Sequence, residues 1–275
     1  MEMESRGGMR SPSGASALGR ALGKHSPKND AWTSTTFILL CFCMIVDKAD
    51  QIMLPAVFLQ ICQEFNAGPA FLGTVTLCRG LAQAVVALAC GPLSAQYNRI
   101  KIVGWGCIIW GIASFGCALA GGRYSLLFFR AINGIGLGLA IPVIQAIVSD
   151  LFPPLERGRA FGALNFMDSF GGTVGGLFAT SVAGGIVVGI SGWRFAFHSV
   201  ALISVGLGSL VLQLGVDPPP NSEGVHAAKQ KMDFTLFWAE FKDILKLPTF
   251  QVIIAQGSFG TMPWCKYTHT LHTAT

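Results

Sequence analysis

Charged side chains stand inside long apolar stretches of this sequence. Six residues do so: Asp47, Lys48, Asp50, Arg79, Arg130 and Asp168. A charge at the centre of a membrane-spanning helix costs about 2.5–3.5 kcal/mol on insertion scales, so such residues usually face a cavity or pair with one another. A carboxylate beside an arginine can take up or release a proton, and both groups can bind a polar solute. These six residues are therefore the candidates for chemistry.

The stretches that carry these residues have the length of membrane-spanning helices. Hydrophobic residues make up 52% of the 275 residues and Asp, Glu, Lys and Arg only 12%, against roughly 25% charged residues in globular domains. This composition argues against most soluble enzymes and against a nucleic-acid binder. Six apolar runs are long enough to cross a hydrocarbon core of roughly 30 Å, and they cover residues 36–58, 70–91, 102–122, 124–148, 161–185 and 195–215.

Basic residues predict the orientation of these runs. With the amino terminus in the cytoplasm, the inner segments hold thirteen Lys and Arg residues and the outer segments hold only Arg123 and Arg194. This is a strong positive-inside bias. We therefore expect an integral, multi-pass membrane protein whose amino terminus is cytoplasmic.

The composition also predicts four segments along the chain. Residues 1–33 have the composition of a disordered cytoplasmic tail, with a transit peptide as the alternative. A six-span transmembrane bundle follows at 34–216. Residues 217–248 form a cytoplasmic loop in which 233–247 has the pattern of an amphipathic helix, lying on the membrane or packed under the bundle. The last segment, 249–275, combines an incomplete seventh span with a polar tail.

Depth along the helices pairs the charges of different spans. At a rise of ~1.5 Å per residue, Asp47 and Arg79 both lie roughly 16–17 Å from the inner face, and Asp50 and Arg130 both lie roughly 21 Å from it. We therefore predict the ion pairs Asp47–Arg79 and Asp50–Arg130. Asp47 and Asp50 share one face of their helix, so Lys48 points elsewhere, toward a neighbouring helix.

Two interpretations of these charges are open. They form a substrate- or proton-coupling site near the midplane, or they are static ion pairs that fix the register of the helices. Packing alone does not require so many costly groups at one depth, which favours the functional interpretation. Asp168 is shallower, roughly 11 Å from the inner face, where it lines an inner vestibule with Asn165 or has a structural role. His198, beside Phe197, is more typical of a core histidine than of a proton relay.

Small residues and cysteines have structural interpretations. Gly171 and Gly175, like Gly172 and Gly176, form small-xxx-small patterns that let helix backbones approach closely. The eight cysteines contain no CxxC pair and no zinc-ligand spacing with histidine. We therefore expect no disulfide framework, no metal site and no cofactor.

Several short segments together resemble the major facilitator superfamily of transporters. The loop between the second and third runs, residues 91–101, is similar to the family's loop motif Gly-x-Leu-(Ala/Ser)-Asp-Arg-x-Gly-Arg-(Arg/Lys)-(Arg/Lys). Gly91, Arg99 and Lys101 match it, as do Leu93 and Ser94, whereas the motif's Asp is replaced by an alanine. Residues 130–136 resemble the family's Arg-x-x-x-Gly-x-Gly motif, and residues 156–162 and 192–198 also resemble family segments.

The resemblance implies a fold and an activity. The family transports solutes by alternating access, in which two six-helix bundles rock around a midplane site. Its first, second, fourth and fifth spans line the cavity, and the charges found above lie on those four spans. Within the family, residues 47–55 and 97–99 are similar to plant and algal members related to the spinster branch, which is linked to lysolipid export. Gly91, Arg99 and Lys101 would then belong to a gating loop.

We therefore expect half of a secondary active transporter and no enzyme. The fold class is all-α membrane, with the amino-terminal six-helix bundle of the major facilitator fold and a fragment of a seventh helix. The substrate is a small organic or lipid-like solute, moved with a coupling ion or proton, and lipids surround the protein. The polar residues after Trp264 suggest a truncated or misspliced gene product. The alternative is a non-transporting half that binds or regulates a full-length partner, or that dimerises through its cavity face.

Two other classes of membrane protein fit poorly. A seven-span receptor needs its amino terminus outside, which would reverse the basic-residue bias. An intramembrane protease needs a Gly-x-Ser-Gly turn within a span, and none of the apolar runs holds one.

Overall fold

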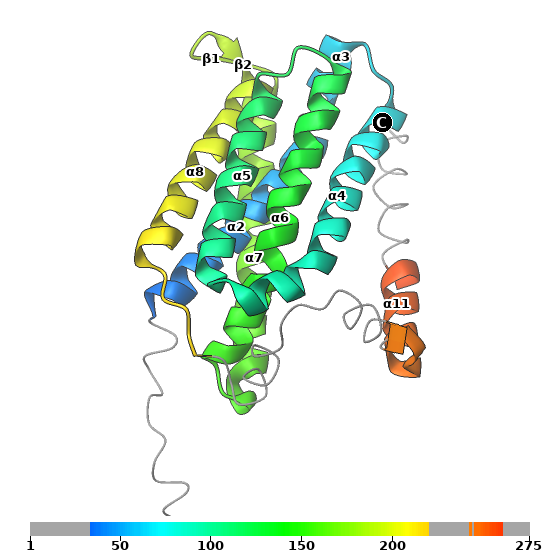
Figure 1. Cartoon of the computed structure of the whole chain (residues 1–275). Helices are drawn as coiled ribbons and strands as arrows, with labels where there is room; N and C mark the ends of the chain where they lie inside the picture. The colour runs from blue at the N-terminus through cyan, green and yellow to red at the C-terminus, as the bar shows by residue number, and fades with distance from the viewer. Residues whose placement is uncertain (1–33, 220–241, 244, 261–275) are drawn as a thin grey trace, which may run out of the picture. The chain divides into compact units, whose positions relative to one another are not determined.

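The computed structural model of the chain describes residues 34–219, 242–243 and 245–260, which belong to two units. The larger unit holds residues 34–90 and 98–219, and the smaller one holds residues 91–97 and the segments after residue 241. Figure 1 labels the elements, which are α2 (Thr35–Ala56), α3 (Phe58–Phe65), α4 (Pro69–Gln96), α5 (Arg99–Ala118), α6 (Arg123–Leu151), α7 (Pro154–Ala183), β1 (Ile186–Val187), β2 (Ile190–Ser191), α8 (Gly192–Leu214) and α11 (Pro248–Gly260).

Each of the six apolar runs is helical over most of its length, as α2, α4, α5, α6, α7 and α8. Two elements were not predicted. The short helix α3 follows α2 after a break at Val57, next to Pro55 in the last turn of α2. Strands β1 and β2 form a small antiparallel hairpin between α7 and α8, with Val187 paired to Ile190.

Four of the described helices, α4, α5, α6 and α8, are long and apolar enough to cross a membrane by length and composition. The helices α2 and α7 are of similar length but fall outside this group. Three charged residues interrupt the middle of α2, and glycines and Asp168 dilute the apolar character of α7. Length and composition thus support four of the six predicted spans directly. Whether α2 and α7 can also cross a membrane depends on how the bundle accommodates their charges.

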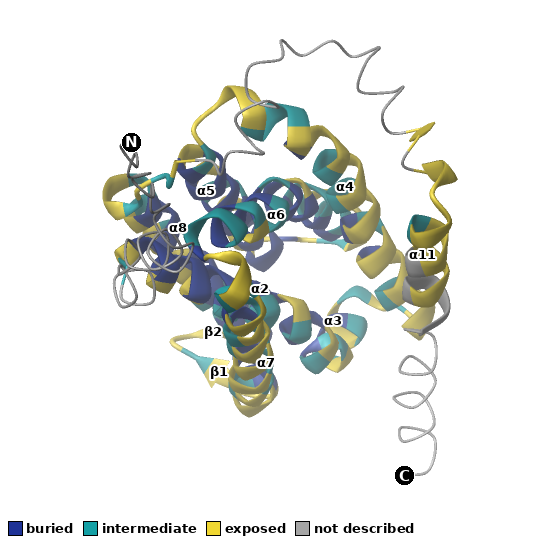
Figure 2. Cartoon of the chain, turned by 90° about the horizontal axis from the view of Figure 1, so that it is seen from below, coloured by how far each residue is buried: buried dark blue, intermediate teal, exposed yellow. Residues whose placement is uncertain are grey.

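The helices of the larger unit pack in two groups that share α8. In one group α5 packs against both α6 and α8, and in the other α2 packs against α7 and α8. Figure 2 shows the buried residues of α5 and α6 turned toward their neighbours, whereas α4 and α7 keep wide exposed faces. In the apolar stretch of α4 only 11% of the residues are buried, compared with 67% in α5.

Glycines bring helix backbones together where the sequence predicted it. A Cβ on Gly171 would run into the backbone of Ile45, and one on Gly175 would lie 2.5 Å from the Cα of Ala49. Because real side chains do not fit at such distances, α7 can pack this closely on α2 only with glycine at these positions. On α6, Gly134 lies in the same way against the backbone of α4. This contact fixes which face of α6 turns toward α4.

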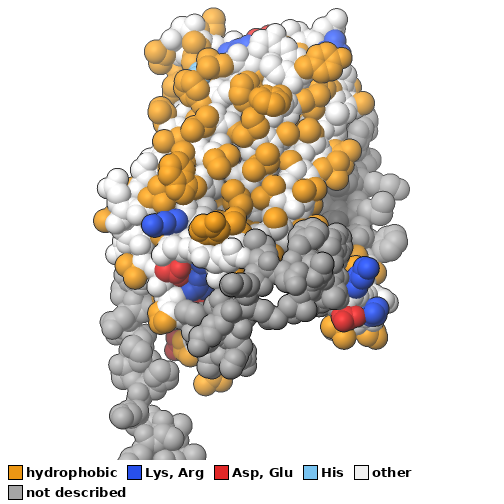
Figure 3. Space-filling view, viewed as in Figure 1, with side chains coloured by type: hydrophobic (Ala, Val, Ile, Leu, Met, Phe, Trp, Pro, Cys, Tyr) orange, Lys and Arg blue, Asp and Glu red, His pale blue; other side chains and the backbone are white. Residues whose placement is uncertain are grey.

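Apolar side chains cover much of the outer surface of the bundle. Figure 3 shows them spread over the face formed by α8, α5 and α6, with the charged side chains of the bundle near the two ends of that face. Exposed Trp105, Ile112, Phe128 and Leu202 belong to these helices. Such a band is typical of a surface in contact with lipid.

Three predictions concern segments that lie wholly or mostly outside the described residues. These are the disordered tail at 1–33, the amphipathic helix at 233–247 and the polar end after Trp264. Within the second of these segments, residues 242–243 and 245–246 are helical, and this helical stretch ends before Pro248. The new helix α11 begins at that proline and covers the start of the predicted seventh run.

Candidate functional site

The most deeply buried ion pair joins α2 to α6. Arg130 donates from Nη1 to Oδ2 of Asp50 at 3.0 Å, and the two side chains are 1% and 0% exposed. The guanidinium also lies over the ring of Phe197 on α8, with Cζ 4.8 Å from the ring centroid. This confirms the predicted pairing of Asp50 with Arg130 and adds an aromatic neighbour to it.

A second pair joins α2 to α4. Arg79 donates from Nη2 to Oδ1 of Asp47 at 3.2 Å, and the side chains are 9% and 13% exposed. The predicted pairing of Asp47 with Arg79 is therefore also confirmed. Within residues 34–219, the other carboxylate oxygen of Asp47 has no hydrogen bond, so this acid is held at one point only.

Asn133 on α6 links the two pairs. Its Oδ1 accepts a hydrogen bond from Nε of Arg79 at 3.0 Å, and its Nδ2 donates to Oδ2 of Asp50 at 3.3 Å and to Oγ of Ser114 at 3.0 Å. Ser114 on α5 in turn donates to Oδ1 of Asp50 at 3.3 Å. The two acids, two arginines, Asn133 and Ser114 thus form one continuous buried network, which we call the polar network.

The two partners of the Asp50–Arg130 pair differ in how fully their hydrogen-bonding groups are satisfied. Asp50 accepts hydrogen bonds from three groups, whereas Arg130 makes one and leaves its buried Nε and Nη2 without a partner among the described residues. An unpartnered buried donor costs about 1–3 kcal/mol, and more when it is charged. Arg130 therefore depends strongly on Asp50 and on the ring of Phe197.

A third pair lies beside the network and is less buried. Lys48 on α2 lies 3.3 Å from Oδ2 of Asp168 on α7, with side chains 32% and 21% exposed. The prediction that Lys48 points toward a neighbouring helix is confirmed, and Asp168 is its partner. Asn165, one turn earlier on α7, is exposed.

The residues of the predicted gating loop have separate surroundings. Arg99, at the start of α5, donates to Asp150 at 2.5 Å, to Asp217 at 2.9 Å and to the carbonyl of Pro218 at 2.6 Å. It thereby ties the start of α5 to the end of α6 and to the segment after α8. Lys101 is exposed, and its backbone N–H is capped by Asn98. Gly91, in the smaller unit, accepts a hydrogen bond from Ser94.

Sequence reasoning missed two members of the polar network. Only charged side chains were paired by depth from the sequence, so the uncharged Asn133 and Ser114 received no role. A signal for both was present, because Ser114 is the only clearly polar residue of its apolar run and Asn133 stands one turn after Arg130. The partners of Arg99, Asp150 and Asp217, were also missed, since both lie at the ends of spans where charges are common.

A buried charged network across α2, α4, α5 and α6 is typical of proteins that move polar solutes through a membrane. Residues 36–271 match the Major Facilitator Superfamily. The chain belongs to this family.

Two curated relatives and one solved structure illustrate the likeness. A gentisate transporter of Corynebacterium glutamicum is 28% identical over 233 residues, which cover 80% of this chain and 51% of the relative. Multidrug resistance protein 3 of Bacillus subtilis is 32% identical over 144 residues, or 52% of this chain and 26% of the relative. The chain spans about half the length of these relatives or less.

The structural likeness extends to a bacterial homologue of the human lysosomal transporter Spinster. In its inward-facing, unoccupied conformation it matches with a TM-score of 0.61 at 22% identity, over 71% of this chain and 45% of that one. At this identity the likeness concerns the fold. The chain therefore has a helical major facilitator fold.

Proposed function

We propose that this chain supplies one bundle of a secondary active transporter, which moves a small organic or lipid-like solute by alternating access. The observation that supports this most is the polar network. Burying four charges inside a bundle is expensive, and replacing such pairs by apolar residues is often neutral or stabilising. A network of this kind is therefore better explained by binding and ion coupling than by stability.

Within the network we assign proton coupling to Asp47. Its single contact with Arg79 at 3.2 Å is easily exchanged, because one carboxylate oxygen stays without a hydrogen bond within residues 34–219. Asp50, which accepts from three donors, holds the helices together instead. We further propose that Lys48 and Asp168 meet the solute at the edge of the network, because their side chains are more exposed than those of the two deeper pairs.

The solute class follows from the relatives rather than from the network. The polar network holds two acids and two bases, so it is neutral as a whole. A relative named for gentisate makes an aromatic carboxylate the first solute to test. The grouping with plant and algal spinster-related members remains part of the proposal, and it rests on residues 47–55 and 97–99.

We also propose that six helices cross the membrane, with the amino terminus in the cytoplasm. The basic-residue bias supports this orientation. The contacts of α2 and α7 support their place as spans, because both pack on helix α8, which is apolar enough to cross by itself. Their charges at depth are paired, which lowers the cost of carrying them into the membrane.

Alternating access needs a second bundle to close the site from the other side. Exposed apolar stripes on two helices offer a surface for it. On α4 they are Leu77, Leu81, Val85 and Leu88, and on α7 they are Phe166, Phe170, Val174 and Leu177. The partner in our proposal is a second copy of the chain, and a longer homologue is the alternative.

Proteoliposomes that contain a pH-sensitive dye test the proposal. Purified chain is separated into monomer and dimer fractions, and gentisate is added outside. We expect gentisate-dependent proton movement from the dimer only. It should be lost in Asp47→Asn and kept in Asp243→Asn, an exposed acid in the smaller unit.

Two outcomes would contradict this assignment. Flux from the monomer that is unaffected by Asp47→Asn would refute both the coupling role and the need for a second bundle. If neither the monomer nor the dimer shows flux and a longer homologue co-purifies, the chain is better described as a non-transporting half than as a transporter.

A further inference from the structure

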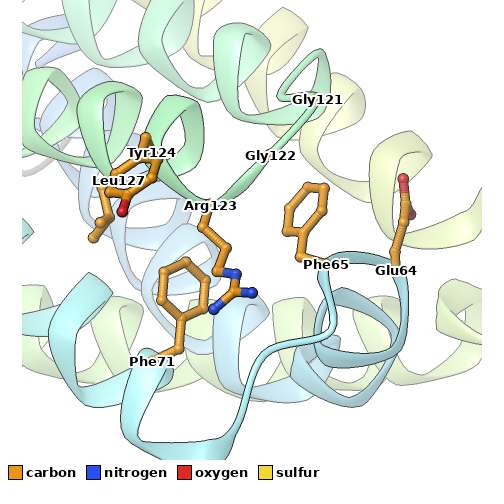
Figure 4. A pocket seen from close by; sticks show the side chains of 8 residues that line it. All are labelled: Glu64, Phe65, Phe71, Gly121, Gly122, Arg123, Tyr124 and Leu127. Atoms are coloured by element: carbon orange, nitrogen blue, oxygen red, sulfur yellow. The ribbon is translucent and has the colours of Figure 1, made fainter.

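A hollow of about 600 Å³ lies at the end of the bundle where the α5–α6 loop approaches α3 and the start of α4. None of the residues of the polar network lines it. Ligand pockets are typically about 300–1,000 Å³, with mostly apolar walls and a few polar groups. Figure 4 shows Phe65 and Phe71 on opposite sides of the Arg123 side chain, with Tyr124 and Leu127 nearby.

The one acid of the hollow is already neutralised. Glu64 accepts from Nη2 of Arg194 at 2.6 Å and from Nε1 of Trp193 at 2.7 Å. Arg194 also donates to the carbonyl of Ala118, the last residue of α5, and to that of Ala120 in the loop after it. Figure 4 shows the Glu64 carboxylate turned away from Arg123. This acid therefore contributes little negative charge to the hollow.

Arg123 is the free cation of the hollow. Its side chain is exposed, and among the residues that the structure describes it has no hydrogen bond or ion pair. Gly121 and Gly122, which precede it, have open space where a Cβ would stand. The planar guanidinium matches carboxylate and phosphate groups with two parallel hydrogen bonds.

We propose that this hollow binds an amphipathic organic anion. Its anionic group lies on the Arg123 guanidinium, and its apolar body lies against the rings of Phe65 and Phe71. Aromatic walls favour a planar ring through offset or edge-on contacts. The anion is either a free solute or the headgroup of an anionic lipid, since both present the same chemistry. The site does not depend on transport by the polar network.

Equilibrium binding of 2-naphthoate to the full chain tests this site. The chain is placed in phosphatidylcholine nanodiscs, and 2-naphthylmethanol serves as the neutral probe of the same shape. We expect the acid to bind more tightly than the alcohol. Arg123→Gln should weaken the acid about tenfold or more and leave the alcohol unchanged, because charge-assisted hydrogen bonds are lost.

Further variants separate the charge from the apolar wall. Phe71→Ala should weaken both probes, and Arg123→Lys should keep part of the preference for the acid. Lys246→Gln removes one exposed charge in the smaller unit and should change neither. The proposal is overturned if Arg123→Gln binds 2-naphthoate as wild type does, or if acid and alcohol bind equally to the wild type.

Nanodiscs of phosphatidylglycerol distinguish the two sources of the anion. Persistence of the Arg123-dependent binding of 2-naphthoate there assigns the site to a free solute. Its loss in phosphatidylglycerol, while it is kept in phosphatidylcholine, assigns the site to a lipid headgroup. Because binding is measured without a gradient or flux, a failed transport assay has no bearing on the result.

Discussion

Replacing Asp50 by asparagine is expected to destabilise the bundle more than replacing Arg130 by methionine. In Asp50→Asn the guanidinium of Arg130 stays charged and buried, and it faces a neutral amide and the ring of Phe197 in place of a carboxylate. In Arg130→Met the carboxylate of Asp50 keeps the hydrogen bonds from Ser114 and Asn133. The charge left behind is therefore better satisfied in the second variant.

The size of the effect follows from the burial of the pair. Removing one partner of a buried ion pair costs about 3–5 kcal/mol. Because the two side chains are only 0% and 1% exposed, the loss of unfolding free energy should be about 5 kcal/mol in Asp50→Asn. It should be about 3 kcal/mol in Arg130→Met, where the remaining charge is better satisfied. At about 2–4 °C per kcal/mol for a chain of this size, the melting temperatures should fall by roughly 10–20 °C and 6–12 °C.

Thermal unfolding in detergent, followed with a thiol-reactive dye, measures these shifts. The buried thiols of Cys41, Cys43 and Cys107 become reactive when the bundle opens. Asp243→Asn, which changes an exposed acid, is the control and should leave the melting temperature unchanged. The double variant Asp50→Asn/Arg130→Met should recover part of the loss, since no unpaired charge remains.

Three results would contradict this reasoning. The first is a melting temperature for Asp50→Asn equal to that of the control. The second is strict additivity in the double variant, which would mean that the two side chains do not stabilise each other. Equal losses in the single variants would refute the proposed difference in how the two charges are satisfied.

Three further predictions concern packing, the inner end and orientation. Gly171→Val should destabilise the bundle by about 1–3 kcal/mol or more because its side chain meets the α2 backbone, whereas Gly162→Val on the same helix has open space and should cost little; thermal unfolding compares the two. Arg99→Gln should lower stability by about 1–3 kcal/mol through its lost charged hydrogen bonds, and an unchanged melting temperature would contradict this. Val188→Cys and Leu155→Cys, at exposed positions of opposite predicted sides, should react with an impermeant maleimide on intact cells only at position 188.

The sequence was sufficient to predict the two deep ion pairs. Helical rise and membrane thickness together fix the depth of a residue, and charges at equal depth on adjacent spans have few other partners. Asp47–Arg79 and Asp50–Arg130 follow from this argument alone. A close helix–helix approach at Gly171 was also predictable, because a small-xxx-small pattern marks such a contact, whereas its partner α2 came from the structure.

Rotation of a helix about its axis was not predictable in the same way. Asn133 joins the two ion pairs only because α6 turns that face toward α4, where Gly134 lies against the backbone of Arg79. Depth gives no information on this rotation. The partners of Arg99 were not predictable either, since Asp217 is close to it only after α8 has returned to the same end of the bundle.

The position of Asn133 between the two ion pairs restricts which substitutions the bundle can tolerate there. An amide accepts from Arg79 with one atom and donates to Asp50 with the other. A mutation to aspartate would set a second anion against Asp50. A mutation to leucine would remove one hydrogen bond from Arg79 and one from Asp50. Each pair can therefore be exchanged only together with residue 133. We expect natural variants of this bundle to change these positions as a set, with single substitutions at residue 133 the rarest.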